Sequence, residues 1–270
     1  MKILIFTGGL GNQIFGYIFY KYLQKKYPLE KIYGVYNHHK MSEHYGLEVN
    51  KYFDVKLPPS PWWIQIYTAY LYCLKKLHLT NNIISMDTRT FDSKSIVNNA
   101  CKMHINYIEQ ANSLPHFKEI VLSERNKSIL NDIKSTPSVF IHVRRGDYYS
   151  PKYIARLGGT CPKEYYEKAI KYIIDKVPQA RFYIFSDDID YVKQNFSIPN
   201  SQFIDWNVNN NSYLDMYLMS NCKYAIIANS TFSFWGAMLG TKKEIVIYPT
   251  KWINSPATAP TIFPHNWITF

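Results

Sequence analysis

The sequence predicts an α/β protein whose second half forms a parallel, doubly wound sheet. Apolar runs of strand length alternate there with longer segments that have the apolar spacing of helices. A strand, a glycine-rich loop and a helix also open the chain, which places a further βα unit far upstream of that series. Such alternation implies parallel strands, and right-handed crossovers bring their carboxyl ends to one edge of the sheet.

The length and composition fit a folded protein with one large domain or two of ordinary size. The chain has 270 residues, of which 47% are hydrophobic. Met1–Phe6 runs straight into glycines, which indicates a strand and not a signal peptide, and no apolar stretch has the length of a membrane span. The cysteines are far apart and form no C-x-x-C pair, so we expect reduced thiols in a cytoplasmic protein. They are Cys73, Cys101, Cys161 and Cys222.

The charge balance predicts a negatively charged partner. The chain has 31 basic and 20 acidic residues, for a net charge of +11. Six of the basic residues are arginines, two of them the adjacent Arg144 and Arg145, and the lysines are scattered without a nucleic-acid-binding module around them. A nucleotide or an anionic membrane surface therefore explains the charge better than a nucleic acid.

The chain opens with a strand at 2–6, a helix from Ile14 to Lys26 and a second strand at 31–36. The loop between the first strand and the helix contains Gly8-Gly9-Leu10-Gly11-Asn12-Gln13. Its glycines permit close approach of a phosphate or sugar, and the amides of Asn12 and Gln13 can bind hydroxyl groups. A tight turn with Asn12 as the helix cap explains the same residues. The loop lacks the G-x-G-x-x-G pattern with a following acidic residue, which argues against a dinucleotide.

Residues 40–120 alternate less regularly, and their most distinctive segment is 61–78. It reads as a helix with aromatic side chains on nearly all sides, followed by Lys75, Lys76 and His78. Such a helix can lie in a membrane interface. The alternative is a core or dimer helix. We favour this alternative because tryptophan and tyrosine are common in interiors and interfaces.

The second half begins after a helix at 119–134. We expect Ser135-Thr136-Pro137 to mark the boundary between two domains, 1–135 and 136–270. The following strands are expected at 139–143, 181–185, 202–204, 224–228 and 244–248. The helices between them are expected at 163–176, 188–195, 211–220 and 232–239.

Polar residues follow three of these strands at the edge where ligands bind in open α/β sheets. The first strand ends in His142-Val-Arg-Arg-Gly-Asp147, and two guanidinium groups there suit a diphosphate. A solvated loop closed by an Arg–Asp ion pair is the alternative. The third strand ends in Asn229-Ser230-Thr231, which opens the helix that begins with Phe232. Ser230 and Thr231 can simply cap this helix, but a capped helix start is also an anion site.

The second strand end carries Asp187 and Asp188. The D-x-D pattern of Asp188 and Asp190 can bind a metal, although Asp190 serves equally well as a helix cap. An aspartate there can instead bind a guanine edge or ribose hydroxyls. Because the two arginines can neutralise a diphosphate, we predict nucleoside recognition without a metal.

These motifs resemble a known family. They are Gly8-Gly-Leu-Gly-Asn-Gln13, His142-Val-Arg-Arg-Gly-Asp-Tyr148, Cys161 with Tyr165-Tyr166, Phe185-Ser-Asp-Asp188, Asp215-Met-Tyr-Leu-Met-Ser220, Cys222-Lys223, Ala228-Asn-Ser-Thr-Phe-Ser233 and Trp235-Gly236. The chain resembles the bacterial α-1,2-fucosyltransferases of glycosyltransferase family 11 nearly from end to end. Phe234 and Tyr224 depart from the tryptophan and histidine usual in that family, and we expect both beside the donor site.

The resemblance implies a GT-B-like fold, in which two Rossmann-like lobes face each other across a cleft. Residues 1–135 would form the acceptor-side lobe and 136–270 the lobe that binds GDP-fucose. It also implies inverting transfer of L-fucose from GDP-β-L-fucose to the 2-hydroxyl of a terminal galactose on an oligosaccharide or polysaccharide, without a cofactor or metal ion. A peripheral contact with the membrane through 61–78 would be compatible with this activity.

The resemblance also implies roles for individual residues. Arg144 would bind the β-phosphate, with Arg145 supporting the loop or the same charge. Asp147 is the best-placed general base, although GDP phosphate can itself accept the acceptor's proton. Ser230 and Thr231 would add phosphate contacts, Asp187 or Asp188 would read the guanosine, and Asn12 would face the fucose. The expected donor-binding residues are Gly11, Asn12, Gln13, His142, Arg144, Arg145, Asp187, Asp188, Asn229, Ser230, Thr231 and Phe232.

Two other functions stay open from the sequence. One is a different nucleotide-sugar transferase that uses a metal ion through Asp188 and Asp190. The other is a protein that binds a nucleotide or glycan without catalysis. Either would use the same edge of the sheet.

Overall fold

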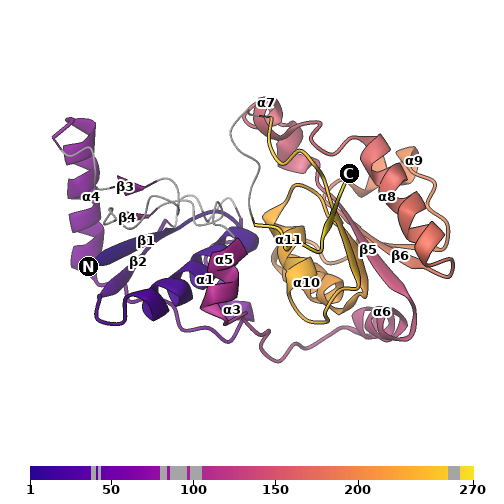
Figure 1. The fold of residues 1–270 in the computed structure, drawn as a ribbon, viewed down its shortest axis with the longest axis horizontal. Helices are drawn as coiled ribbons and strands as arrows, with labels where there is room; N and C mark the ends of the chain where they lie inside the picture. The colour runs from indigo at the N-terminus through magenta and orange to yellow at the C-terminus, as the bar shows by residue number, and fades with distance from the viewer. Residues whose placement is uncertain (38–40, 42–43, 80–83, 86–95, 98–104, 255–261) are drawn as a thin grey trace. The chain divides into compact units, whose positions relative to one another are not determined.

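The structure, a computed structural model, divides the chain into two compact units (Figure 1). It describes residues 1–270 except 38–40, 42–43, 80–83, 86–95, 98–104 and 255–261, so Cys101 lies outside the described residues. The first unit comprises Met1–Lys118 with Pro260–Phe263, and the second comprises Glu119–Ala259 with Pro264–Phe270. Each unit contains a parallel sheet, which confirms the α/β class and two Rossmann-like lobes. The placement of these lobes across a cleft stays a prediction.

The predicted domain boundary at 135–136 is wrong, because the division falls between Lys118 and Glu119. The helix α6 (Glu124–Ser135) belongs to the second unit, where it packs against β5 (Ser138–Val143) and α10 (Ser212–Asn221). It begins five residues later than expected, at a Ser123 cap whose side chain accepts a hydrogen bond from the Asn126 amide. An amphipathic helix beside a boundary can pack on either side, which the sequence pattern alone does not decide.

The sheet of the first unit has the strand order β2-β1-β4-β3, and all neighbouring pairs are parallel. The strands are β1 (Lys2–Phe6), β2 (Ile32–Tyr36), β3 (Ile84–Ser85) and β4 (Ile96–Val97), and the helices are α1 (Leu10–Lys26), α3 (Val49–Tyr52), α4 (Trp62–Lys76) and α5 (Ile105–Ala111). Ile3 and Ile5 pack with α4. On the other face of β1, Phe6 packs so closely against Gly16 of α1 that a Cβ there would lie 2.8 Å from its ring.

The helix α1 begins four residues earlier than predicted. Its cap is Gly9 and not Asn12, which lies inside the first helical turn. Gly8 adopts a φ of 75°, a left-handed conformation that favours glycine. This reverses the chain directly after β1, so the helix starts as soon as the turn is complete.

The sheet of the second unit has the order β10-β9-β8-β5-β6-β7, again with parallel neighbours, so the predicted doubly wound sheet is confirmed. Its strands are β5, β6 (Arg181–Ser186), β7 (Ser201–Ile204), β8 (Tyr224–Ile226), β9 (Ile245–Tyr248) and β10 (Ile268–Thr269). From β5 the chain builds outward to β7 and then returns to place β8 on the other side of β5. This reversal is the topological switch point, beside which α/β sheets bind their ligands.

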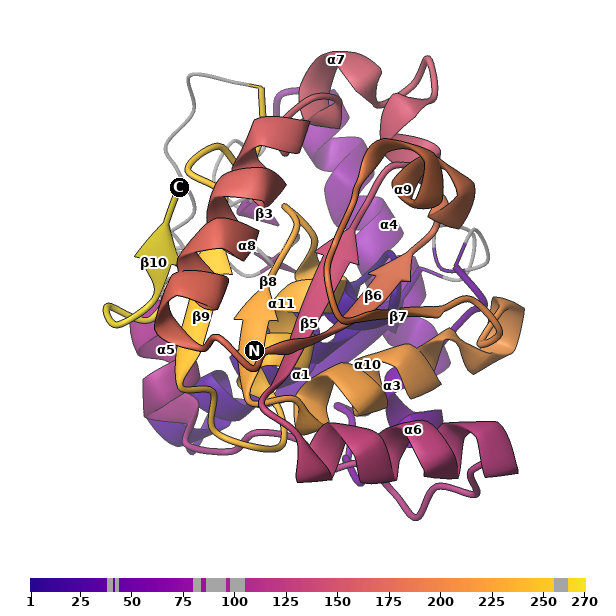
Figure 2. The same ribbon diagram turned by 90° about the vertical axis from the view of Figure 1, so that its right-hand side faces the viewer.

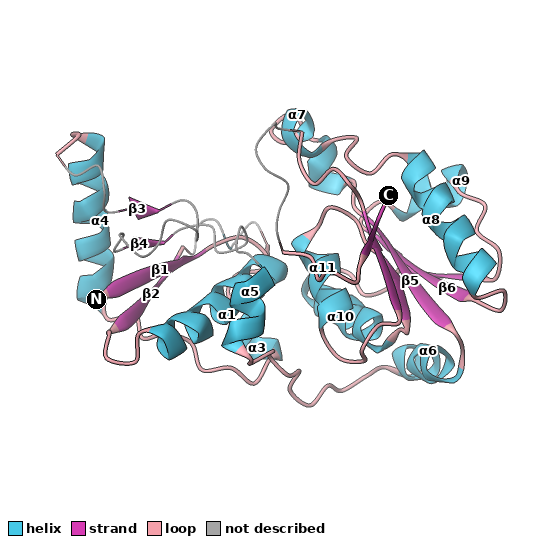
Figure 3. Cartoon of the chain, in the orientation of Figure 1, coloured by secondary structure: helices cyan, strands magenta, loops and turns pink. Residues whose placement is uncertain are grey.

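Helices cover both faces of this sheet, as Figures 1, 2 and 3 show. The helices α8 (Lys163–Lys176) and α9 (Ile189–Asn195) lie on one face, and α10 and α11 (Thr231–Met238) lie on the other. Val139, Ile141 and Val143 belong to the core under α8. Because side chains alternate along a strand, His142 points to the opposite face, where its ring lies 5.9 Å from that of Phe232 in α11.

Candidate functional site

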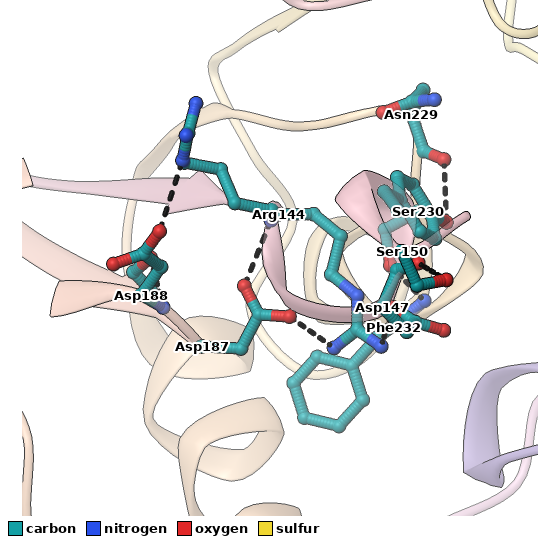
Figure 4. A network of polar contacts seen from close by, with 11 residues as sticks. Arg144, Asp147, Ser150, Asp187, Asp188, Asn229, Ser230 and Phe232 are labelled. Atoms are coloured by element: carbon teal, nitrogen blue, oxygen red, sulfur yellow. Dashed lines mark hydrogen bonds and ion pairs between the residues drawn. The ribbon is translucent and has the colours of Figure 1, made fainter. Parts of the chain in front are cut away.

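The polar residues predicted at the sheet edge gather at the carboxyl ends of β5, β6 and β8 (Figure 4). The register pairs β5 with β6 on one side and with β8 on the other, so the three strand ends are neighbours. Shortly after β5 the chain forms a short helix, η3 (Gly146–Tyr149), whose Asp147 side chain pairs with Arg144 in this cluster. The convergence expected from the sequence is therefore present within the second unit.

Arg144 is the central cation of the site. Its guanidinium pairs with Asp147 at 2.7 Å and with Asp187 at 3.1 Å, and its side chain is 25% exposed. Its Nε is buried and has no hydrogen-bond partner. Burial lowers the pKa of Arg144, but Asp187 and Asp147 outweigh this effect and raise the pKa above its ordinary value. Arg144 therefore stays charged, with one donor still unsatisfied.

Arg145 has a different environment, although it is adjacent in sequence. Its Nε donates to Asp188 at 3.0 Å, and its backbone amide donates to Asp187 at 2.8 Å. Its guanidinium carbon lies 3.4 Å from the ring centroid of Tyr191 and 4.1 Å from that of Tyr149. Stacking between two aromatic rings immobilises this guanidinium and uses its faces. These contacts fit the first of the two roles expected for Arg145, support of the loop, which stays a prediction.

Asp187 and Asp188 also position the arginines. Asp187 accepts from the Arg145 amide with one oxygen and pairs with Arg144 through the other, and a Cβ on Gly146 would overlap its carboxylate. Asp188 caps α9 by accepting from the Tyr191 amide at 3.3 Å, while its second oxygen accepts from Arg145. The cap of α9 is thus Asp188, not Asp190. This geometry does not support nucleoside recognition by these carboxylates.

The metal-binding alternative gains no support from the geometry either. Both oxygens of Asp188 are engaged by the helix cap and by Arg145. Within the described part of the chain, no three His, Cys, Asp or Glu side chains are arranged to hold a metal ion.

The end of β8 supplies a helix start to the site. Ser230 caps α11 by accepting from the Phe232 amide at 3.3 Å, as the sequence predicted. The hydroxyl of Tyr148 donates to the Asn229 carbonyl at 3.1 Å, which joins the β5 loop to the β8 loop. The Asn229 side chain is occupied elsewhere, since its amide donates to the Trp252 carbonyl at 3.0 Å. Asn229 therefore shapes the loop, while Thr231 and Phe232 are partly exposed at the helix start.

His142 lies beneath this cluster and is buried. Burial, aided by the nearby charge of Arg144, lowers the pKa of His142 to about 3. The imidazole is therefore neutral at physiological pH. Its Nδ1 is buried without a partner, and its backbone carbonyl accepts from Tyr166 at 3.2 Å. Two buried nitrogens without hydrogen-bond partners, one on His142 and one on Arg144, thus lie two residues apart at the end of one strand.

The loop residues predicted to contact the donor lie in the first unit, and the side chain of Gln13 is hydrogen-bonded within the protein. Its side-chain amide donates to the carbonyls of Gly8 at 3.0 Å and Gly46 at 2.8 Å. Its oxygen accepts from the amides of Glu48 at 2.8 Å and Val49 at 3.1 Å. Every polar group of the buried Gln13 is satisfied internally, so it ties together the surrounding loops. Gly11 is buried in α1, whereas Asn12 is partly exposed.

The sequence profile of glycosyl transferase family 11 matches residues 68–270. This chain belongs to glycosyl transferase family 11. The motifs from His142 to Gly236 that carried the resemblance lie within the matched region, whereas the glycine-rich motif at 8–13 lies outside it. The predicted family membership is confirmed.

Relatives within known proteins include two from Escherichia coli. The O-antigen biosynthesis glycosyltransferase WbnK is 33% identical over 179 residues, which cover 57% of this chain and 58% of WbnK. An alpha-1,2-colitosyltransferase is 38% identical over 141 residues, which cover 51% of this chain and 49% of the relative. This family 11 chain thus spans about half the length of the curated relatives it matches. Fucosyltransferase NodZ from Bradyrhizobium gives a TM-score of 0.45 at 14% identity, over 88% of this chain and 93% of NodZ.

Sequence reasoning missed the aromatic residues that surround the family 11 site. Tyr148 and Tyr149 directly follow the arginine motif, and this adjacency was a usable signal for their contacts with Asn229 and Arg145. Tyr191 had no such signal, because it reaches Arg145 from a different helix. One of the two departures from the family pattern lies away from the site. Tyr224 opens β8, at the end of the strand opposite to the site, so expecting it beside the donor was wrong.

Proposed function

We propose that this family 11 glycosyltransferase moves L-fucose from GDP-β-L-fucose to the 2-hydroxyl of a terminal galactose, with inversion at the anomeric carbon. The observation that carries the proposal is Arg144, a charged guanidinium with an unsatisfied donor at the switch point of a doubly wound sheet. Arginine matches phosphate oxygens in geometry and charge. The start of α11, capped by Ser230, adds the partial positive charge of a helix end at the neighbouring strand.

The bond that breaks leaves negative charge on the β-phosphate of GDP. Donors that strengthen their contacts as this charge develops lower the barrier more than they tighten ground-state binding. Arg144 and the amides at the start of α11 are the groups of the second unit that fit this task. Arg145 contributes indirectly, because its stacking and its contacts with Asp187 and Asp188 keep the β5 loop in place.

Binding of the diphosphate changes the surroundings of Asp147. In the structure this carboxylate pairs with Arg144, which lies three residues before it in sequence, and its side chain is 35% exposed. Asp187 is held more firmly, since it also accepts from a backbone amide. We infer that the diphosphate displaces Asp147 from Arg144. The freed carboxylate is then available to take the proton of the acceptor hydroxyl.

The proposal is tested by release of GDP from GDP-fucose in the presence of lacto-N-biose, N-acetyllactosamine, lactose and Gal-β1,3-GalNAc. Arg144→Ala is expected to lower turnover by about 100-fold or more, since loss of one charge-stabilising donor costs about that much. Arg181→Ala is the matched control. Arg181 also pairs with an aspartate, Asp132, but at the opposite end of β6. Turnover by the Arg144 variant close to that of the control would contradict the assignment.

A second donor is favoured by one observation, the 38% identity to an alpha-1,2-colitosyltransferase. Colitose is fucose without its 3-hydroxyl, so GDP-colitose would use the same diphosphate contacts. Direct competition between GDP-fucose and GDP-colitose for one acceptor separates the two candidates. A higher kcat/KM for GDP-colitose would transfer the proposal to colitose without changing the role of Arg144.

A further inference from the structure

Helix α4 is apolar on two opposite faces, and the described residues cover only one of them. Ile64 and Leu71 pack with β1, and Thr68 between them is also buried. At 100° per residue, Trp62, Ile66 and Tyr70 lie within 80° of one another on the other side of the helix. Their side chains are 76%, 62% and 56% exposed. We call these three residues the α4 stripe.

The α4 stripe belongs to a larger exposed apolar surface. Single exposed apolar residues are ordinary, but a contiguous group of them marks an interaction site. The exposed large apolar residues of this segment are Trp62, Trp63, Ile66, Tyr67, Tyr70, Tyr72, Leu77 and Leu79. Trp63 also contacts Tyr33 of β2 edge to face at 5.1 Å, which anchors the start of the helix to the sheet. The exposed apolar surface is therefore formed by a helix whose opposite face is packed on the sheet.

The charged residues in the sequence segment that contains α4 are all basic. Lys75 and Lys76 form its last turn, and His78 follows. Residues 55–86 include no aspartate or glutamate, in a chain with a net charge of +11. We propose that the α4 stripe docks on an anionic lipid bilayer. Tryptophan and tyrosine have apolar rings with polar tips that suit the interface, and the lysines can reach the headgroups while their stems lie along the helix.

The size of the surface favours a bilayer over a second copy of the chain. A 15-residue helix is about 22 Å long and about 10 Å wide, a footprint of roughly 220 Å². A stable protein interface buries about 800 Å² on each partner. A bilayer needs no matching partner surface, since the side chains insert individually among the lipids. Among the described residues, no helix combines the length and the apolar composition of a membrane span.

The test is co-sedimentation of the full chain, at low salt, with vesicles of equal parts phosphatidylcholine and phosphatidylglycerol. The variant Trp62→Ser, Ile66→Ser, Tyr70→Ser removes the α4 stripe. Its matched control is Leu29→Ser, Val121→Ser, Val208→Ser, which removes three apolar side chains that are 98%, 90% and 58% exposed elsewhere. We expect the control to bind like the wild type and the stripe variant to bind at least tenfold less, with unchanged transfer to lactose in solution.

A second pair of variants tests the charge. Lys75→Gln with Lys76→Gln is expected to weaken vesicle binding several-fold, whereas Lys134→Gln with Lys242→Gln, which removes the same charge elsewhere, leaves it unchanged. Vesicles of phosphatidylcholine alone, or high salt, are expected to abolish most of the binding. Failure of the wild type to bind anionic vesicles, or equal binding by the stripe variant, would overturn the proposal. A wild-type dimer in the absence of lipid that the stripe variant converts to a monomer would assign the surface to a second copy instead.

Discussion

Arg144 and Arg145 follow one another at the end of β5, yet their guanidinium groups meet different surroundings. Arg144 has two carboxylate partners and an unsatisfied Nε, whereas Arg145 is stacked between two tyrosines and bound to Asp188. A ligand can therefore accept a hydrogen bond from Arg144, whereas both faces of the Arg145 guanidinium are already covered by tyrosine rings. We therefore propose that Arg144 binds phosphate and that Arg145 supports the loop.

This division predicts opposite results for two conservative substitutions. Arg145→Lys is expected to lower the free energy of unfolding by about 1–2 kcal/mol, because an ammonium group cannot stack between Tyr149 and Tyr191 as a guanidinium does. Arg144→Lys is expected to change stability less and transfer more. Urea unfolding and GDP release, measured on both variants, provide the comparison. Equal loss of stability in the two would refute the separation of roles.

Asp147 allows two separate predictions, because its pairing with Arg144 affects GDP binding and its proposed role as a base affects kcat. Asp147→Asn weakens the pairing with Arg144 that competes with phosphate, so GDP is expected to bind several-fold more tightly. The same change removes the base, and kcat is expected to fall by 10²-fold or more, roughly the contribution of a positioned base. Calorimetric titration with GDP and steady-state kinetics test the two parts. Tighter binding with unchanged kcat would mean that GDP phosphate accepts the proton.

At the scale of elements, the start of α1 contains two side-chain amides in different environments. Gln13 and Asn12 are adjacent amides in the first helical turn, but only Gln13 is buried and fully hydrogen-bonded within the protein. Gln13→Leu leaves four backbone groups without their partner. We expect it to lower the free energy of unfolding by about 3 kcal/mol, from roughly 1 kcal/mol for each lost hydrogen bond offset by apolar burial.

Asn12→Ala is the matched comparison for Gln13→Leu. Asn12 is partly exposed, and we propose that it contacts the sugar, so its loss is expected to lower kcat/KM without affecting thermal unfolding. Thermal melts and donor kinetics on both variants distinguish the two roles. Unchanged melting of the Gln13 variant would show that its hydrogen bonds contribute little.

The elements around the site were largely predictable, whereas their polar contacts were not. The runs at 139–143, 181–185 and 224–228 are apolar, of strand length and separated by helices, so local pattern was sufficient to place them and their carboxyl ends. The tasks of Asp187 and Asp188 depend on Arg145, which is more than 40 residues away in sequence. No local sequence pattern predicts that both carboxylates will be hydrogen-bonded to Arg145. The start of α1 was missed for a different reason, since a glycine cap has no side-chain signal.

At the scale of the whole molecule, the buried His142 and the half-buried Asp215 of the second unit have pKa values that move in opposite directions. Burial lowers the pKa of His142 to about 3, from an ordinary value of 6.5. Burial raises the pKa of Asp215 to about 8, from 3.8, although a hydrogen bond from Asn207 opposes this shift. Asn207 also donates to Asn126 of α6, so Asp215 belongs to a polar network that ties α6 to α10.

The two shifts predict an asymmetric dependence of stability on pH. Between pH 3 and 6.5 the unfolded chain binds more protons at His142 than the folded one, so this residue makes stability fall as the pH drops below about 6.5. Between pH 3.8 and 8 the folded chain binds more protons at Asp215, so that residue makes stability fall as the pH rises toward 8. The contributions of His142 and Asp215 to the slope oppose each other where their pH windows overlap, and above pH 6.5 Asp215 is the one of the two that still contributes. Urea unfolding at a series of pH values should therefore show Asp215→Asn losing less stability than the wild type between pH 6.5 and 8, while His142→Asn flattens the acidic side. Parallel curves of unfolding free energy against pH for the wild type and both variants would mean that neither group has the shifted pKa described.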